Sequence, residues 1–196
     1  FFPFHTGRPG AGRPGAGKPG AGARAGGGLG RLARVVRPPV DLDEVLTERA
    51  RCLCAILLHH PELVHDVEEA FARVDMPAWL SRVRDETLHW AEAAETLDSA
   101  ALLSHLESSR LAEDAARVRA ATPWPLPEYA KPDAMPADAE TGWWHLFGLL
   151  NREHLDEEIA AARQDFIVRG DEASERKLIA LCKARHELYA LDPELE

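Results

Sequence analysis

The strongest constraint on the fold is the spacing of apolar residues in the last third of the chain, residues 143–191. One set recurs at steps of four, three and four, which places its members on one face of a helix: Leu155, Ile159, Ala162 and Phe166. A second apolar stripe precedes it, at Trp143, Phe147 and Leu150. Together they predict one helix over 137–169, roughly 50 Å long at ~1.5 Å per residue. We expect its far end to project from a compact bundle.

The residues after this helix predict a tight turn and a second helix. Gly170 can adopt a positive φ without a Cβ clash, so it is a suitable helix end. Asp171 and Ser174 are both candidate N-caps for the next helix. That helix carries apolar residues at helical spacing: Leu178, Leu181, Cys182, Leu188 and Tyr189. The expected result is an antiparallel helical hairpin.

The region before the hairpin predicts a bundle of five shorter helices. Asp41 is a candidate N-cap with Glu44 three positions later, and Pro61 ends the helix that follows. Pro77 begins a further helix, and either Asp98 or Ser99 caps the one after it. A crossing with five prolines in fifteen residues separates the bundle from residue 137. No useful strand alternation occurs. We therefore expect an all-α fold: a helical bundle, a long helix and a C-terminal antiparallel helical hairpin.

Charge and glycine content divide the chain into three parts. Residues 1–38 contain a five-residue repeat, GRPGA, and hold seven basic and no acidic residues, so we interpret them as a flexible basic linker. Removing those seven leaves 16 basic against 33 acidic residues, a net charge of −17 for the rest. The expected domains are the linker 1–38, the helical bundle 39–136, and the long helix with the hairpin, 137–196.

Several residues of reactive type do not form a recognisable catalytic or metal-binding pattern. Cys52 and Cys54 diverge by about 200° on a helix, so with His59, His60 and His65 they are interpreted as core thiols and a helix-ending turn. Three more histidines have no readable nucleophile or carboxylate partner: His145, His154 and His186. No nucleotide-binding loop is present. We expect neither catalysis nor a cofactor in this chain.

Tryptophans 143 and 144 cannot both point the same way on a helix. One of them is expected to pack in the core. The other either covers the proline-rich crossing or forms an exposed anchor for a partner, since tryptophan is favoured at binding hot spots.

Two segments resemble the C-terminal helicase-binding region of bacterial DNA primase. The segment LDEEIAAARQDFIVRGDEASERKLIALCKARHEL looks like its terminal helical hairpin, and CLCAILLHHPELV looks like the opening helix of the same region. The order and spacing of the two also fit, and the resemblance covers roughly residues 41–191. It implies a helical bundle and a projecting hairpin, with the zinc-binding and magnesium-dependent polymerase regions ahead of Phe1.

The resemblance also implies two partners. The hairpin would dock on the N-terminal region of the hexameric replicative helicase, through Glu175, Arg176, Leu178, Ile179, Cys182, Lys183, Arg185, His186 and Tyr189. The first bundle helix would receive the acidic C-terminal tail of the single-stranded-DNA-binding protein at Arg49 and Arg51, because guanidinium groups pair with carboxylates. The fit is looser there, since Leu46 and Ala50 depart from the expected basic and longer residues.

Two alternatives remain open from the residues alone. The basic linker would give a stand-alone helical protein a salt-sensitive, non-specific affinity for nucleic acid, although the acidic body would repel phosphates. A small helical enzyme or regulator would instead use the histidines. An odd cysteine count without a signal peptide or a long apolar run favours a cytoplasmic protein with reduced thiols and no membrane contact.

Overall fold

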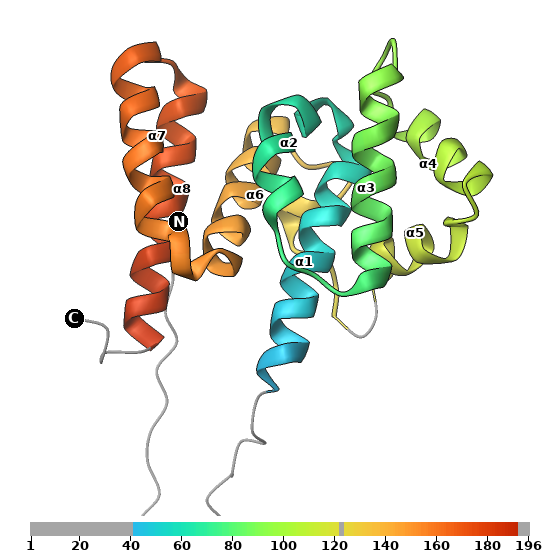
Figure 1. Cartoon of the computed structure of the whole chain (residues 1–196), viewed down its shortest axis with the longest axis horizontal. Helices are drawn as coiled ribbons and strands as arrows, with labels where there is room; N and C mark the ends of the chain where they lie inside the picture. The colour runs from blue at the N-terminus through green and yellow to red at the C-terminus, as the bar shows by residue number, and fades with distance from the viewer. Residues whose placement is uncertain (1–40, 122–123, 192–196) are drawn as a thin grey trace, which may run out of the picture. The chain divides into compact units, whose positions relative to one another are not determined.

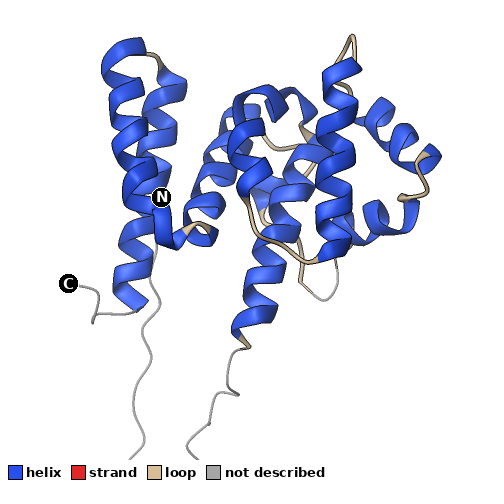
Figure 2. Ribbon diagram, in the orientation of Figure 1, coloured by secondary structure: helices blue, strands red, loops and turns tan. Residues whose placement is uncertain are grey.

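The computed structural model describes residues 41–121 and 124–191; the predicted linker, residues 1–38, lies outside them. Figures 1 and 2 show helices and loops with no strand in this part of the chain, which confirms the all-α class. The α-helices are α1 (Leu42–His59), α2 (Val64–Arg73), α3 (Ala78–Ala93), α4 (Ser99–Ser108), α5 (Ala112–Arg119), α6 (Pro136–Leu150), α7 (Leu155–Arg169) and α8 (Glu172–Leu191). Short 3-10 turns also occur: η1 (Pro61–Leu63), η2 (Glu128–Ala130) and η3 (Arg152–His154).

Two bundle helices begin at the aspartates that the sequence indicated. The Asp41 Oδ1 atom accepts a hydrogen bond from the Asp43 N–H at 3.0 Å, at the start of α1. The Asp98 Oδ1 atom accepts one from the Ala101 N–H at 3.0 Å, at the start of α4. Each bond satisfies an amide that has no partner inside its helix, and such a cap is worth ~1 kcal/mol.

Prolines set several other helix boundaries. Helix α1 ends at His59, and Pro61 follows as the first residue of η1. Pro77 immediately precedes α3, and Pro136 is the first residue of α6. Proline cannot donate a backbone hydrogen bond within a helix, but it fits the first turn, where the amide has no partner anyway.

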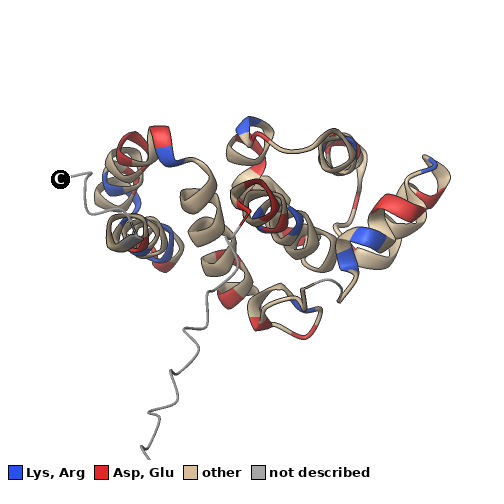
Figure 3. Cartoon of the chain, turned by 90° about the horizontal axis from the view of Figure 1, so that it is seen from below, with Lys and Arg blue, Asp and Glu red and all other residues tan. Residues whose placement is uncertain are grey.

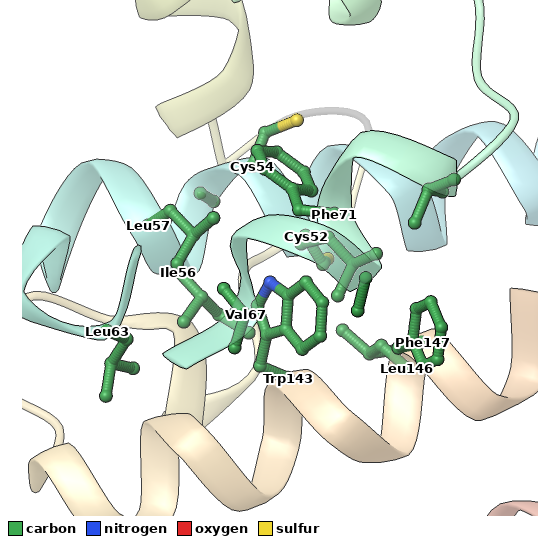
Figure 4. Packing of buried hydrophobic residues seen from close by; sticks show 14 of the residues in the cluster. Cys52, Cys54, Ile56, Leu57, Leu63, Val67, Phe71, Trp143, Leu146 and Phe147 are labelled. Atoms are coloured by element: carbon green, nitrogen blue, oxygen red, sulfur yellow. The ribbon is translucent and has the colours of Figure 1, made fainter. Parts of the chain in front are cut away.

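Trp143 of α6 lies at the centre of the hydrophobic core and is fully buried. Its ring stacks on Phe147 with 5.5 Å between centroids and meets Phe71 of α2 edge-on at 6.1 Å. Figure 4 shows the indole facing side chains of α1 and α2, among them Ile56 and Val67. Such aromatic pairs contribute ~0.5–1.5 kcal/mol beyond the area that they bury. Helix α6 therefore joins the bundle through its tryptophan.

Two consecutive histidines attach the proline-rich crossing to α1. The His59 Nδ1 atom lies 2.8 Å from the Ala130 carbonyl oxygen, and the His60 Nε2 atom lies 2.9 Å from the Lys131 carbonyl oxygen. These contacts confirm that the HHP sequence ends the first helix as a structural turn. They also hold η2 against the end of α1.

Gly142 allows the crossing to pack directly on the backbone of α6. A Cβ atom at this position would lie 2.3 Å from the Tyr129 ring, closer than any side chain tolerates. The tyrosine ring therefore occupies the space that a side chain at Gly142 would fill. Burial raises the pKa of Tyr129 to about 12.

The prediction of a single helix over 137–169 is wrong, because the helix is interrupted at Asn151. The Asn151 backbone has φ −96° and ψ 44°, and its N–H bonds to the Phe147 carbonyl oxygen at 2.8 Å to close α6. The break lets Leu155 return to α6, where its Cδ1 atom lies 3.2 Å from the position of a Cβ on Gly148. Helix α7 can then pair with α8 instead of extending α6.

Helix α8 packs between α6 and α7, as Figure 1 shows in orange and red. The approach to α6 is closest at Gly148, where a Cβ atom would lie 2.8 Å from the Ala184 Cβ and 3.3 Å from the Leu181 Cδ2. Ala180, Leu181 and Ala184 are all buried. Small residues on both helices permit this spacing, so the α7–α8 hairpin is anchored along α6.

Candidate functional site

The turn between α7 and α8 forms as its residues predicted. Gly170 has φ 62°, the left-handed conformation that favours glycine, and ends α7. The Asp171 Oδ1 atom accepts the Ser174 N–H at 2.8 Å, while the Ser174 hydroxyl donates to the Asp171 carbonyl oxygen at 2.9 Å. The hydrogen bonds from Ser174 lower the pKa of Asp171. Of the two candidate caps, Asp171 is therefore the N-cap and Ser174 its partner.

Two cations fix the first half of α8 to α6. The guanidinium of Arg176 donates to the Glu140 Oε2 atom from Nη2 at 2.7 Å and from Nε at 3.1 Å. The Lys177 Nζ atom lies 4.0 Å from the centroid of the Trp144 ring, a cation–π contact. Burial lowers the pKa of Lys177. Both contacts orient the hairpin relative to the core.

The interpretation of the second tryptophan as an exposed anchor is wrong. Trp144 is 3% exposed, because Lys177 of α8 covers its ring. It meets Trp143 edge-on at 4.9 Å and Phe147 edge-on at 5.7 Å. Adjacent positions on one helix can both be buried here because α6 is enclosed on two sides, by the bundle and by α8.

The nine hairpin residues named for helicase docking divide into two groups. Five of them are exposed: Glu175, Ile179, Lys183, His186 and Tyr189. Four are half-buried: Arg176, Leu178, Cys182 and Arg185. Leu178 and Cys182 pack against the core, and Arg185 bonds to Asp156 of α7 at 3.2 Å. The exposed group is accessible to solvent, while the other four hold the hairpin together or attach it to the core.

Sequence reasoning missed two exposed apolar residues near the turn of the hairpin. Ile167 is 69% exposed and Val168 is 73% exposed, in the last turn of α7. They follow Phe166, the last residue of the buried stripe, and fall off that stripe by helical spacing. Two adjacent branched apolar residues outside a periodic stripe would have been a recognisable indication of a docking surface.

Arg51 is part of the interior and not of a surface for peptides. Its side chain is about 4% exposed and bonds to Glu48 through Nε at 2.8 Å and through Nη2 at 2.5 Å. The remaining donors reach three backbone carbonyl oxygens, those of Val118, Ala120 and Trp124, at 2.6 to 3.0 Å. All five guanidinium N–H groups are thereby used. Arg51 closes the end of α5 and has no donor left for a peptide carboxylate.

Arg49 lies in a different setting, on the wall of a groove of about 460 Å³. Its apolar lining includes Leu46, Leu150 and Leu188, and its charged lining carries both signs, with Arg73 and Arg152 beside Asp75 and Glu153. Partial burial lowers the pKa of Arg49, and nearby Glu187 acts in the opposite direction. Arg51 lines another pocket, together with the acidic Asp43, Glu44 and Glu48, so of the two arginines named for an acidic tail Arg49 has the setting that suits one better.

The cysteines of α1 are core residues, as predicted. Cys52 and Cys54 are buried, and burial raises their thiol pKa values to about 11 and about 12 respectively. Cys182 of α8 is half-buried. Within the described residues, no group of three or more histidine, cysteine or carboxylate side chains is arranged to hold a metal ion.

The other histidines lie next to carboxylates at the surface or at helix contacts. The His145 Nε2 atom of α6 lies 3.2 Å from the Glu187 Oε2 atom of α8, and His154 lies 3.4 Å from Glu157. His186 is exposed. His65 is exposed as well, next to Glu68 at 3.6 Å.

Acidic residues occur on all eight described α-helices, and Figure 3 shows them spread over the fold. This distribution would repel the phosphates of nucleic acid and attract cationic groups. A search of the described residues found no helix with the length and apolar character needed to cross a membrane.

Comparison with known proteins gives no match at any level. No protein-family model fits the chain, and no curated protein and no solved structure is similar to it. The geometry of the hairpin and the resemblance of its sequence are therefore the basis for a functional proposal.

Proposed function

We propose that residues 41–191 form a protein-docking domain, and that the α7–α8 hairpin binds the replicative helicase as the C-terminal region of a bacterial DNA primase does. The observation that carries the proposal is the apolar pair near the turn of the hairpin, Ile167 at 69% and Val168 at 73% exposed. Neighbouring exposed branched side chains gain free energy when a partner removes them from water.

The anchoring of α8 supports a rigid docking element. Glu140 and Trp144 of α6 hold Arg176 and Lys177, so the hairpin does not need to order itself on binding. A surface that is already ordered loses less conformational entropy on association. Among the exposed polar residues named for helicase docking, Glu175 lies nearest in sequence to the turn and would help to set the orientation of the partner there.

In this proposal the chain tethers primer synthesis to the helicase and performs no catalysis itself. The zinc-binding and magnesium-dependent polymerase regions would lie ahead of Phe1 in a longer protein. Such a protein would work in the bacterial cytoplasm, at the replication fork.

A pull-down with the hexameric helicase from the same organism tests the hairpin. The double variant Ile167→Ser/Val168→Ser should weaken binding by about tenfold or more, since central apolar contacts dominate interfaces. Leu42→Ser is a matched control, because Leu42 is 66% exposed on α1. Equal retention of the helicase by the double variant and the wild-type chain would reject the hairpin as the docking element.

These point variants are preferable to deletion of α8. Leu181 and Ala184 are fully buried, so removing residues 171–196 would unfold the anchor together with the surface. Circular dichroism should show that the serine variants keep their helical content, because the replaced side chains are mostly in solvent.

The groove at Arg49 supports a second contact, with the acidic tail of a single-stranded-DNA-binding protein. Arg49 lies beside the apolar lining of this groove, so its guanidinium would pair with a carboxylate of a peptide that also carries apolar side chains. Arg49→Glu should abolish the change in fluorescence anisotropy of a labelled tail peptide. Arg82→Glu replaces an exposed arginine on α3 and should leave that change intact.

The alternative, nucleic-acid binding through the basic segment 1–38, concerns residues outside the described part. The acidic character of the helices disfavours it, because like charges would repel phosphates. It would be supported by a salt-dependent affinity for DNA that is lost when residues 1–37 are removed.

A further inference from the structure

A second concave surface lies on the side of α8 that faces the proline-rich crossing. It is a groove of about 500 Å³ between α6, α8 and the segment around η2. Its apolar lining comes from Tyr129, Met135 and Ile179, and its acidic lining from Glu128, Asp133 and Asp138. We call it the acidic groove. Tyr129 packs against the core, whereas Met135, Ile179, Asp133 and Asp138 are exposed and take no part in it.

The apolar residues of the acidic groove are unusually open to solvent. Met135 is 67% exposed and Ile179 is 57% exposed, although they come from separate parts of the sequence. Tyr129 is held against Gly142, which gives this wall a fixed position. Large apolar side chains that converge in one hollow gain free energy when another apolar group covers them.

The charges around the acidic groove favour a cationic occupant. Asp133 and Asp138 are exposed at its rim, and the Glu128 carboxylate lies 2.6 Å from the Lys131 Nζ atom. The pKa of Lys131 is raised, first by its hydrogen bond to Glu128 and then by the charges of Glu128 and Asp133. Lys131 thus already pairs with Glu128, which leaves Asp133 and Asp138 as the carboxylates that an occupant would meet. Lys183 is the basic residue on the α8 side.

We propose that the acidic groove binds a short segment of a partner protein that carries a bulky apolar side chain flanked by lysine or arginine. The apolar side chain would lie on Met135 and Ile179, and the flanking cation would pair with Asp133 or Asp138. Phosphate-bearing ligands are disfavoured, because the carboxylates would repel them. This inference does not depend on helicase binding by the hairpin.

Methionine methyl groups provide a direct test, because the chain contains only two methionines, Met76 and Met135. The full chain is labelled with 13C at the methionine methyl groups and titrated with a short synthetic peptide of alternating leucine and lysine. The Met135 resonance should shift, because it lines the groove. The half-buried Met76 serves as the internal control and should not move.

Matched variants separate the groove from the overall acidity of the chain. Ile179→Asn and the double variant Asp133→Asn/Asp138→Asn should each weaken peptide binding about fivefold or more. Leu42→Asn on α1 and Asp165→Asn on α7 replace an exposed apolar and an exposed acidic residue outside the groove and should change binding less than about twofold.

Several results would overturn the proposal. A peptide with serine in place of leucine that binds equally well would show a general attraction to acidic surfaces. A peptide with glutamate in place of lysine that binds more tightly would reverse the charge preference. A shift of the Met76 resonance without one of Met135, or no binding of the leucine–lysine peptide, would show that the acidic groove is not a binding site of this kind. None of these results alters the expected effect of Ile167→Ser/Val168→Ser on helicase retention, so the two proposals fail separately.

Discussion

The core around Trp143 and the α7–α8 hairpin use apolar residues in opposite ways. Around Trp143, side chains of α1, α2 and α6 are enclosed almost completely, with Phe71 and Phe147 in contact with the indole. In the hairpin, the buried stripe ends near Phe166, and Ile167 and Val168 stand in solvent. The first region therefore supplies the stability of the fold, while the second presents a surface that the fold does not need.

Helix α8 connects the two regions. Its inner residues, Ala180, Leu181 and Ala184, pack as tightly as the core does, whereas Ile179 and Lys183 on its outer side remain exposed. A change on its inner side should consequently reduce stability. A change on its outer side should affect only what binds there.

Among these variants, Trp143→Ala should cause the largest loss of unfolding free energy. Removal of a fully buried tryptophan that stacks on Phe147 should cost ~3–5 kcal/mol of unfolding free energy. Urea unfolding followed by circular dichroism measures this loss. Trp124→Ala, which replaces a tryptophan that is 55% exposed, should cost far less. Similar losses for both variants would contradict the assignment of the core.

Gly148→Val should act mainly on the anchor of the hairpin. A Cβ added at this position would lie 2.8 Å from the Ala184 Cβ, so a valine must push α8 away from α6. This overpacking should reduce the unfolding free energy by ~1–3 kcal/mol. Hydrogen exchange should accelerate in α7 and α8 more than in α1. Ala161→Val, at an exposed site of α7, is the matched control. Uniform acceleration throughout the fold would mean that the hairpin is not a separate unit of stability.

The ion pair between Arg176 and Glu140 should contribute less than either packing contact. The Glu140 side chain is 9% exposed and that of Arg176 is 31% exposed, so solvent screens the pair in part. A double-mutant cycle with Arg176→Gln and Glu140→Gln should give a coupling energy of ~1 kcal/mol. Thermal unfolding of the four proteins provides the values. A coupling energy near zero would show that Lys177 and apolar packing hold α8 without this pair.

The smallest expected effect is a pH dependence from His59. Burial lowers its pKa below the ordinary 6.5, while the bond to the Ala130 carbonyl acts in the other direction. The folded chain thus binds this proton less readily than the unfolded chain, so stability is complete above pH 6.5 and falls as the pH decreases through that value. His59→Gln should flatten the decline in thermal unfolding temperature. An unchanged slope would assign the decline to other groups.

The beginnings and ends of several helices were predictable from single residues. Asp41, Asp98 and Asp171 cap helices and Gly170 ends one, because each effect depends only on a side chain and the next few amides. Apolar spacing likewise located the buried face of α7, at Leu155, Ile159 and Ala162.

The errors came from contacts between distant segments. The break at Asn151 accompanies the packing of Leu181 and Ala184 of α8 on Gly148, and the burial of Trp144 involves Lys177, also on α8. The spacing of apolar residues within α6 does not reveal which residues of α8 pack on it. The prediction that Arg51 receives a peptide failed for a related reason. Residues 50–58 are all buried, and the carbonyl groups that bind the Arg51 side chain lie in residues 118–124. The partner of the hairpin stays a prediction.

The three cysteines differ in burial, so their rates of chemical labelling can report which part of the fold opens. Alkylating reagents react with the thiolate, and burial raises the pKa of Cys52 to about 11 and that of Cys54 to about 12, so both should resist modification until the bundle opens. Cys182 sits half-buried on α8 and can react after a smaller opening. Two labelling rates would then distinguish detachment of the hairpin from complete unfolding, without any introduced probe.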